Sequence, residues 1–191
     1  MNQKEKMRQD LVNELDGYFM QYVYLKDMIT LDDAISSFNC LEKNFPDCKV
    51  VIQCGLQDSY FFSLARLYDK SKGTETIPKL IEKCKKNTHL FQKADIVEKK
   101  LDEFKDELET NKCITDAISV LQSRRDKRYA HNDERYFGMK MVNDKSNLPK
   151  GYLWLLAKFT GKVLNFLWNQ LSDEKPREGR YCKEKAFFEE E

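Results

Sequence analysis

Residues 11–29 read LVNELDGYFMQYVYLKDMI, and their apolar side chains recur at alternating spacings of four and three residues. This spacing places a stripe of side chains along one face of a long helix. The stripe consists of Leu11, Leu15, Tyr18, Tyr22, Leu25 and Ile29. A stripe of this length predicts a bundle in which long helices bury one face against each other.

The same helical spacing recurs along most of the chain. The apolar pattern resumes at Leu31 and continues to Phe45, so this first part forms one bent helix or two, and Pro46 ends it. Gly55, inside a later helix, is a candidate for a close contact between helices. Further helices are expected over residues 48–69, 76–86, 93–108, 112–130 and 150–171.

The composition agrees with an all-α fold of long antiparallel helices. Only 7 Gly and 4 Pro occur among 191 residues, and few turn-forming residues indicate few, long elements. Charged residues make up 34% of the chain and aromatic residues 12%, which is typical of a folded bundle with solvated helix faces. Because 33 basic residues stand against 32 acidic ones, any electrostatic binding site is local. We expect one helical domain over residues 1–171 and a charged, loosely ordered tail over 172–191.

Several functional classes lack their sequence patterns here. The first residues contain no apolar run typical of a signal peptide, and no stretch is apolar enough to cross a membrane, so we expect a cytoplasmic protein without a membrane partner. The six cysteines form no CxxC pair and match no zinc spacing, and only two histidines occur. Glycine-rich phosphate loops and zinc-protease motifs are absent from the sequence. We therefore expect neither a metal nor a cofactor, and we expect the cysteines to be small core residues.

The helix expected over residues 112–130 ends its apolar face in arginine. Its stripe consists of Ile114, Ala117, Ile118 and Leu121. At 100° per residue, Arg125 lies within about 30° of the centre of that stripe, and Arg124 and His131 share the adjacent flank. Residues 122–128 carry a net charge of +3, from four basic residues and one acidic residue. A buried guanidinium needs a partner, so this face must open onto a cleft, a carboxylate or a subunit interface.

Arginine and histidine in this arrangement suit phosphodiester chemistry. The rigid fork of arginine donors fits phosphate oxygens and stabilises charge that develops in a transition state. Histidine transfers protons near neutral pH, and one of each is enough for RNA cleavage without a metal. The structural alternative is that the arginines complement the helix macrodipole and that His131 caps the last carbonyls. A bundle whose arginines only pair with carboxylates is a further alternative.

Two segments resemble a known superfamily. Residues 125–131, RDKRYAH, have the Arg-polar-x4-His form of HEPN domains. Residues 64–69, LARLYD, together with 125–133, RDKRYAHND, are similar to the AbiU2-like branch, which is linked by name to abortive phage infection. The resemblance covers roughly residues 5–171 and implies an all-α, HEPN-like helical bundle.

The resemblance also implies a site and partners. Arg125 would be the cation that binds phosphate, His131 the general acid and base, and Asp126 the residue that orients them. Two copies would face each other so that their motifs form one cleft. The basic neighbours that would bind RNA are Arg124, Lys127 and Arg128. Arg124 also lies at an Arg-x6-His spacing, so either arginine is a candidate for the working cation.

The resulting hypothesis is a metal-independent endoribonuclease of the HEPN type, acting as a toxin or in phage defence, with a possible antitoxin partner. The alternative is a non-catalytic HEPN-like module that binds RNA or a protein.

Arg66 and Asp69 either pair with the Arg125 segment or form ordinary surface pairs, and surface pairing is the preferred interpretation. A solvated helix face is preferred over a nucleic-acid track for Lys79, Lys83, Lys85 and Lys86.

Overall fold

The computed structural model describes residues 2–71, 73–126, 150–172, 174 and 176, and for residues 39–41 it describes the backbone alone. The described residues form helices and connecting turns, without a strand, as the sequence predicts. The elements are α1 (Gln3–Ser37), α2 (Asn39–Asn44), α3 (Pro46–Leu67), α4 (Ile77–Lys86), the short 3-10 helix η1 (Thr88–Leu90), α5 (Ala94–Thr110), α6 (Lys112–Arg124) and α7 (Lys150–Leu171).

Local sequence explains where these helices begin and end. Asn2 and Glu5 form a reciprocal cap at the start of α1, because the Asn2 side chain accepts from the Glu5 amide and the Glu5 carboxylate accepts from the Asn2 amide, both at 2.8 Å. The helix then continues without a break to Ser37. Phe45 separates α2 from α3, so the break before Pro46 is confirmed, but Pro46 itself occupies the first turn of α3, which begins two residues earlier than predicted.

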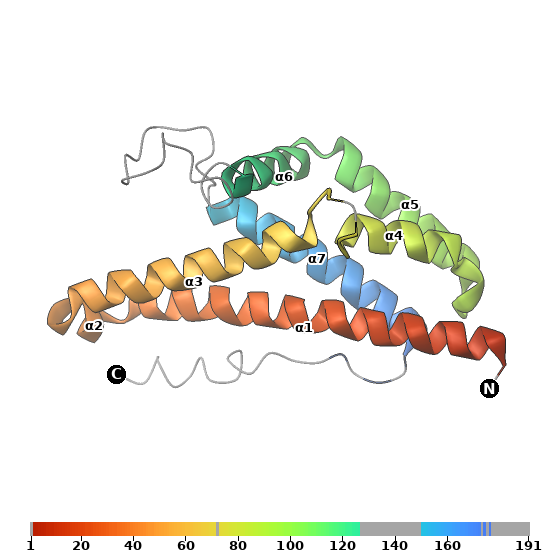
Figure 1. Cartoon of the computed structure of the whole chain (residues 1–191), viewed down its shortest axis with the longest axis horizontal. Helices are drawn as coiled ribbons and strands as arrows, with labels where there is room; N and C mark the ends of the chain where they lie inside the picture. The colour runs from red at the N-terminus through yellow and green to blue at the C-terminus, as the bar shows by residue number, and fades with distance from the viewer. Residues whose placement is uncertain (1, 72, 127–149, 173, 175, 177–191) are drawn as a thin grey trace.

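The helices pack as an elongated bundle (Figure 1). α3 runs antiparallel along α1, and α7 crosses behind both. α4 and α5 lie beyond the end of α3, and α5 and α6 pack against α7. This arrangement brings the end of α3 and the end of α6 together, although 56 residues separate Asp69 from Arg125.

The core contains the stripes that the sequence predicts. On α1, Leu11, Leu15, Tyr18, Leu25 and Ile29 are buried, and Tyr22 packs against the core at its edge. The contact between α1 and α7 depends on Gly161, where an added Cβ would lie 2.6 Å from the Tyr22 ring carbon Cζ. Gly55 has no such neighbour within 4 Å, so its predicted close contact is wrong. Helix α1 can approach α7 so closely only because residue 161 has no side chain.

The C-terminal end of α1 projects beyond the other helices, together with α2 and the start of α3 (Figure 1). We call this projection the arm and define it as residues 27–59. Its buried side chains are few and largely polar; those described are Asp27, Ile29, Asp32, Ile35 and Lys49. Polar contacts join the two helices: Lys49 Nζ donates to the Ser36 carbonyl at 3.1 Å, and the Tyr60 hydroxyl beside the arm donates to Asp32 at 3.2 Å. Large apolar side chains of the arm are instead exposed to solvent, namely Phe45, Val50, Val51 and Ile52.

The cysteines differ from the expectation of small core residues. Cys84 is buried, whereas Cys48, Cys54 and Cys113 are exposed. Cys40 and Cys182 lie outside the side chains that the structure describes.

None of the described helices is long and apolar enough to cross a bilayer.

Candidate functional site

The apolar face of α6 ends in Arg125, as the sequence indicates. Asn111 caps the start of α6 by accepting from the Cys113 amide at 3.0 Å, and this sets the rotation of the helix. Ile114, Ala117 and Leu121 are then fully buried, and Arg125 follows Leu121 by one turn with 26% of its side chain exposed. α6 ends at Arg124, and Arg125 and Asp126 continue in a wider turn. The expected continuation to residue 130 lies outside the described residues.

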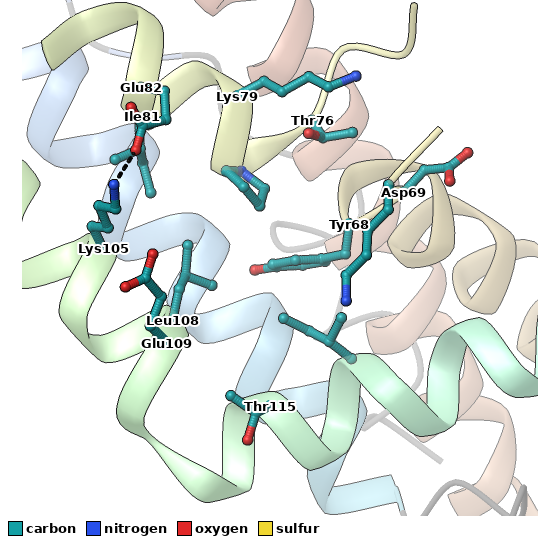
Figure 2. Close-up of a pocket in the computed structure, with 13 residues that line it drawn as sticks. Tyr68, Asp69, Thr76, Lys79, Ile81, Glu82, Lys105, Leu108, Glu109 and Thr115 are labelled. Carbon is teal, nitrogen blue, oxygen red and sulfur yellow. Dashed lines mark ion pairs between the residues drawn. The ribbon is translucent and has the colours of Figure 1, made fainter. Parts of the chain in front are cut away.

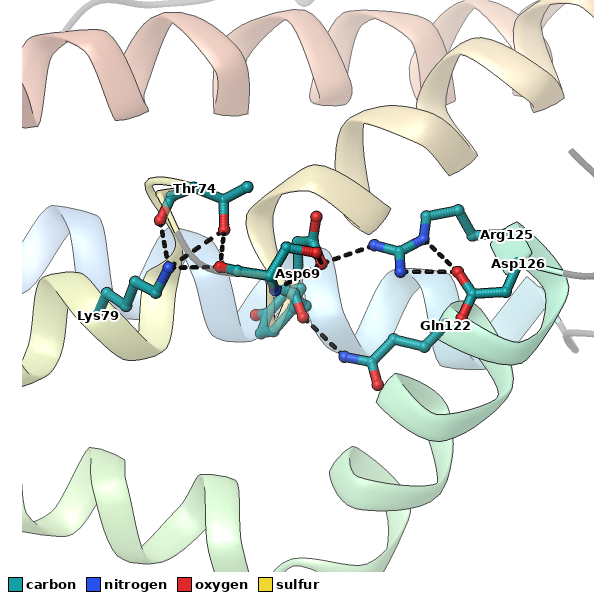
Figure 3. Close-up of polar contacts among 8 residues, drawn as sticks. Asp69, Thr74, Lys79, Gln122, Arg125 and Asp126 are labelled. Atoms are coloured by element: carbon teal, nitrogen blue, oxygen red, sulfur yellow. Dashed lines mark hydrogen bonds and ion pairs between the residues drawn. The ribbon is translucent and has the colours of Figure 1, made fainter. Parts of the chain in front are cut away.

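Two carboxylates hold the Arg125 guanidinium (Figure 3). Nη1 bonds Asp69 at 2.7 Å, while Nη2 and Nε both reach the same oxygen of Asp126, at 2.7 and 2.8 Å. The sequence left a cleft, a carboxylate or a subunit interface as the surroundings of this arginine, and the structure shows carboxylates. Because arginine has five N–H donors, these contacts leave two of them for another acceptor. The pKa of Arg125 is raised, chiefly by the hydrogen bond to Asp69.

The sequence favoured an ordinary surface ion pair for Asp69. In the structure Asp69 instead pairs with Arg125 across the bundle. Its carboxylate also accepts from the Ser71 amide at 3.0 Å and from the Ser71 hydroxyl at 2.9 Å. These hydrogen bonds, that of Arg125 first, lower the pKa of Asp69 from 3.8 to about 2. Arg66, which the sequence grouped with Asp69, is exposed.

Two further side chains stabilise the same junction. Gln122, one turn before Asp126, donates to the Tyr68 carbonyl at 2.9 Å. Lys79 on α4 donates to the carbonyls of Ser71 and Thr74, at 2.8 and 2.7 Å (Figure 3). The end of α3, the loop that follows it and the end of α6 therefore form one hydrogen-bonded unit around Arg125.

Arg124 lies in a different environment from its neighbour. Its guanidinium stacks over the Phe61 ring at 4.9 Å from the centroid, and its Nε is buried without a hydrogen-bond partner among the described residues. Its charge also acts on Tyr60, whose pKa is nevertheless raised, mainly by burial and then by Asp32. The two candidate cations thus differ: Arg125 is held by carboxylates, and Arg124 is held against an aromatic ring.

The remaining predicted site residues, Lys127, Arg128 and His131, lie outside the described residues. The lysines of α4 are inside them, and most have partners within the chain. Lys83 pairs with Glu14 and Lys85 with Asp102, while Lys79 holds the loop described above. These intramolecular contacts occupy the ammonium groups that a nucleic-acid backbone would need.

Across the described residues, no group of three or more His, Cys, Asp or Glu could hold a metal ion.

Comparisons with known proteins give one match. A family model named HEPN_AbiU2 and described as AbiU2 matches residues 6–177, which is 172 of the 191 residues. Neither the curated proteins nor the solved structures contain a match. The matched range contains the segments 64–69 and 125–133, on which the resemblance rests. It also extends six residues beyond the expected domain end at residue 171.

Proposed function

We propose a function that starts from one premise: the chain belongs to the AbiU2 family of HEPN proteins. On that basis it acts as a metal-independent endoribonuclease, in the cytoplasm, as an abortive-infection protein or a toxin. RNA is the substrate, and a second copy of the chain completes the cleft. An antitoxin protein would bind the chain and inhibit this activity.

In the proposed reaction, His131 accepts the proton of a ribose 2′-hydroxyl, and the resulting oxygen attacks the adjacent phosphorus. The bond from phosphorus to the 5′-oxygen breaks, and the leaving oxygen takes a proton from a histidinium. The products are a 2′,3′-cyclic phosphate and a 5′-hydroxyl. Arg125 stabilises the charge on the phosphorane, and Asp126 orients Arg125.

The observation that carries this proposal is the way in which Arg125 is held. Its guanidinium is fixed by Asp69 and Asp126 at the exposed end of an otherwise buried face, and two N–H donors remain. Fixed donors of this kind stabilise a transition state without reorganising during the reaction. Because Asp69 and Asp126 both bond Arg125 and offset its charge, the positive charge that attracts RNA would come from Arg124 and from the next residues, Lys127 and Arg128.

The exposed apolar side chains of the arm support the proposal that two copies of the chain form a dimer. Phe45, between α2 and α3, is 60% exposed, and Val50 and Val51 on α3 are 59% and 71% exposed. A cluster of large exposed apolar groups is typical of a protein interface. Light scattering at micromolar concentration tests this: the wild type should be a dimer, and Val51→Glu should shift it towards the monomer.

The decisive experiment is cleavage of a mixed RNA pool in excess EDTA by the wild type, His131→Ala and His89→Ala. His89 is the other histidine of the chain and is exposed on η1, so its substitution is a matched control. The proposal predicts cleavage with 2′,3′-cyclic phosphate ends by the wild type and by His89→Ala, and none by His131→Ala. Activity that EDTA abolishes, or that His131→Ala retains, would contradict it.

A second candidate is a non-catalytic module that binds RNA or a protein. The specific observation that favours a non-catalytic role is that carboxylates already take three of the five Arg125 donors, so two are left to hold a bound phosphate. Protection of RNA without cleavage, unchanged in His131→Ala, would select the module. If the folded chain binds no RNA even at low salt, the ion pair is structural.

A further inference from the structure

A pocket of about 430 Å³ lies between the end of α3 and helices α4, α5 and α6 (Figure 2). Its volume falls within the range of about 300–1,000 Å³ that is usual for small-ligand sites. Apolar side chains from all four elements line it, namely Tyr68, Pro78, Ile81, Leu108 and Ile118. The Tyr68 hydroxyl is fixed in the core by Thr160 at 2.9 Å, so this part of the wall is rigid.

Most charges around the pocket already have partners within the protein. Lys105 pairs with Glu82 at 2.7 Å, as Figure 2 shows, and Lys79 is bonded to loop carbonyls. Two exposed charges remain, Lys70 and Glu109, for which no hydrogen bond or ion pair is found among the described residues, although the Glu109 carboxylate acts on Lys105 at longer range. The pocket therefore combines an apolar interior with one available ammonium and one available carboxylate.

We propose that this pocket binds the base of a nucleotide. The apolar wall would cover the flat faces of the base, a mode of contact that does not depend on base identity. The Glu109 carboxylate would accept a hydrogen bond from an exocyclic amine, and the Lys70 ammonium would contact the phosphate. Adenine, cytosine and guanine carry such an amine and uracil does not, so the pocket should disfavour uracil.

Asp69 connects this pocket to the site described above, because it lines the pocket and also bonds Arg125. A nucleotide of an RNA chain that passes Arg125 would then have the pocket beside it. This step rests on the proposed function. The same chemistry is present in a free nucleotide, so the experiment must distinguish an RNA chain from a free nucleotide as the source.

The test is calorimetric titration of the full chain with AMP, CMP, GMP and UMP, followed by oligonucleotides that differ at one base. We expect the three amine-bearing nucleotides to bind at least tenfold more tightly than UMP. Glu109→Gln should remove that preference, and Thr115→Trp, which fills the pocket from the α6 side, should abolish binding. Glu98→Gln is the matched control, because Glu98 is an exposed residue of the same helix α5 outside the pocket.

The outcomes separate this inference from the proposed function. If oligonucleotides show the same base preference and lose it in Glu109→Gln, the pocket binds a base of RNA. If mononucleotides bind with that preference and oligonucleotides do not bind, the pocket takes a free nucleotide and the proposed action on RNA fails. If RNA is cleaved but no mononucleotide binds, or Glu109→Gln keeps the preference, the pocket inference is overturned while the proposed function stands.

Discussion

Replacing Asp69 with asparagine tests the link between the end of α3 and the end of α6. Asn has the same shape as Asp and still accepts from Ser71, but it lacks the charge that bonds Arg125. We expect Asp69→Asn to destabilise the fold because the Arg125 guanidinium, only 26% exposed, loses the partner that lies nearest the core.

The magnitude follows from the pKa of Asp69. Folding lowers this pKa from 3.8 to about 2, and each unit corresponds to about 1.4 kcal/mol of preference for the ionised form. The full shift therefore sets an upper bound of about 2.5 kcal/mol. Solvent screens the partly exposed Arg125, so we expect a loss of about 1–2 kcal/mol at pH 7. For a chain of this size, that loss lowers Tm by roughly 2–8 °C.

The pH dependence gives the sharper assay. Because the folded pKa is the lower one, the stabilisation is fully present above the unfolded pKa of about 4 and is lost as the pH falls through the folded pKa near 2. Urea unfolding of wild type and Asp69→Asn should thus differ equally at pH 7 and pH 5, and the difference should shrink between pH 4 and pH 2. Glu98→Gln, on the exposed side of α5, should show no difference at any pH. Equal stability of Asp69→Asn and wild type at pH 7, or a loss that is unchanged at pH 2, would refute the reasoning.

Three further predictions concern packing, capping and thiol reactivity. Gly161→Ala should cost about 1–3 kcal/mol in urea unfolding, because the new methyl group meets the Tyr22 ring; a stability equal to wild type would mean that α1 and α7 can separate freely. Asn111→Ala should cost about 1 kcal/mol and reduce the helical circular dichroism signal modestly, and no loss would show that the cap is dispensable. Cys113 should react with a thiol reagent in the native protein, whereas Cys84 should react only on unfolding, because burial raises its pKa to about 12; equal rates by peptide mapping would contradict this.

The helices could be predicted from the sequence because their signal is local. The alternating spacing of apolar residues in α1 and the proline at Pro46 depend on neighbours within a few residues, and the observed bounds follow them closely. The stripe of α6 likewise predicts that Arg125 continues a buried face, which the structure confirms. The wider turn at Arg125 and Asp126 was not predicted, and the predicted continuation of the helix to residue 130 lies outside the described residues.

The partners of the site residues could not be predicted, because they depend on how helices cross. Asp69 is separated from Arg125 by 56 residues, and no local pattern distinguishes it from an ordinary surface acid. The two glycines illustrate the same limit: Gly55 and Gly161 both interrupt helical patterns, but only Gly161 faces a crossing helix. The exposed cysteines follow the same rule, since exposure depends on which helix covers a face.

The arm has a consequence for how the protein opens. Its two helices are joined by few apolar contacts and by polar contacts such as Lys49 to Ser36, so the arm is a region of low local stability. Its backbone amides should exchange with deuterium through a partial opening that leaves the rest of the bundle folded. Amides near Leu121 should exchange only on global unfolding, because the Asp69–Arg125 pair ties that end of α6 to α3. The molecule is thus expected to unfold in two cooperative units, with the boundary within α1 and α3 where the arm leaves the bundle.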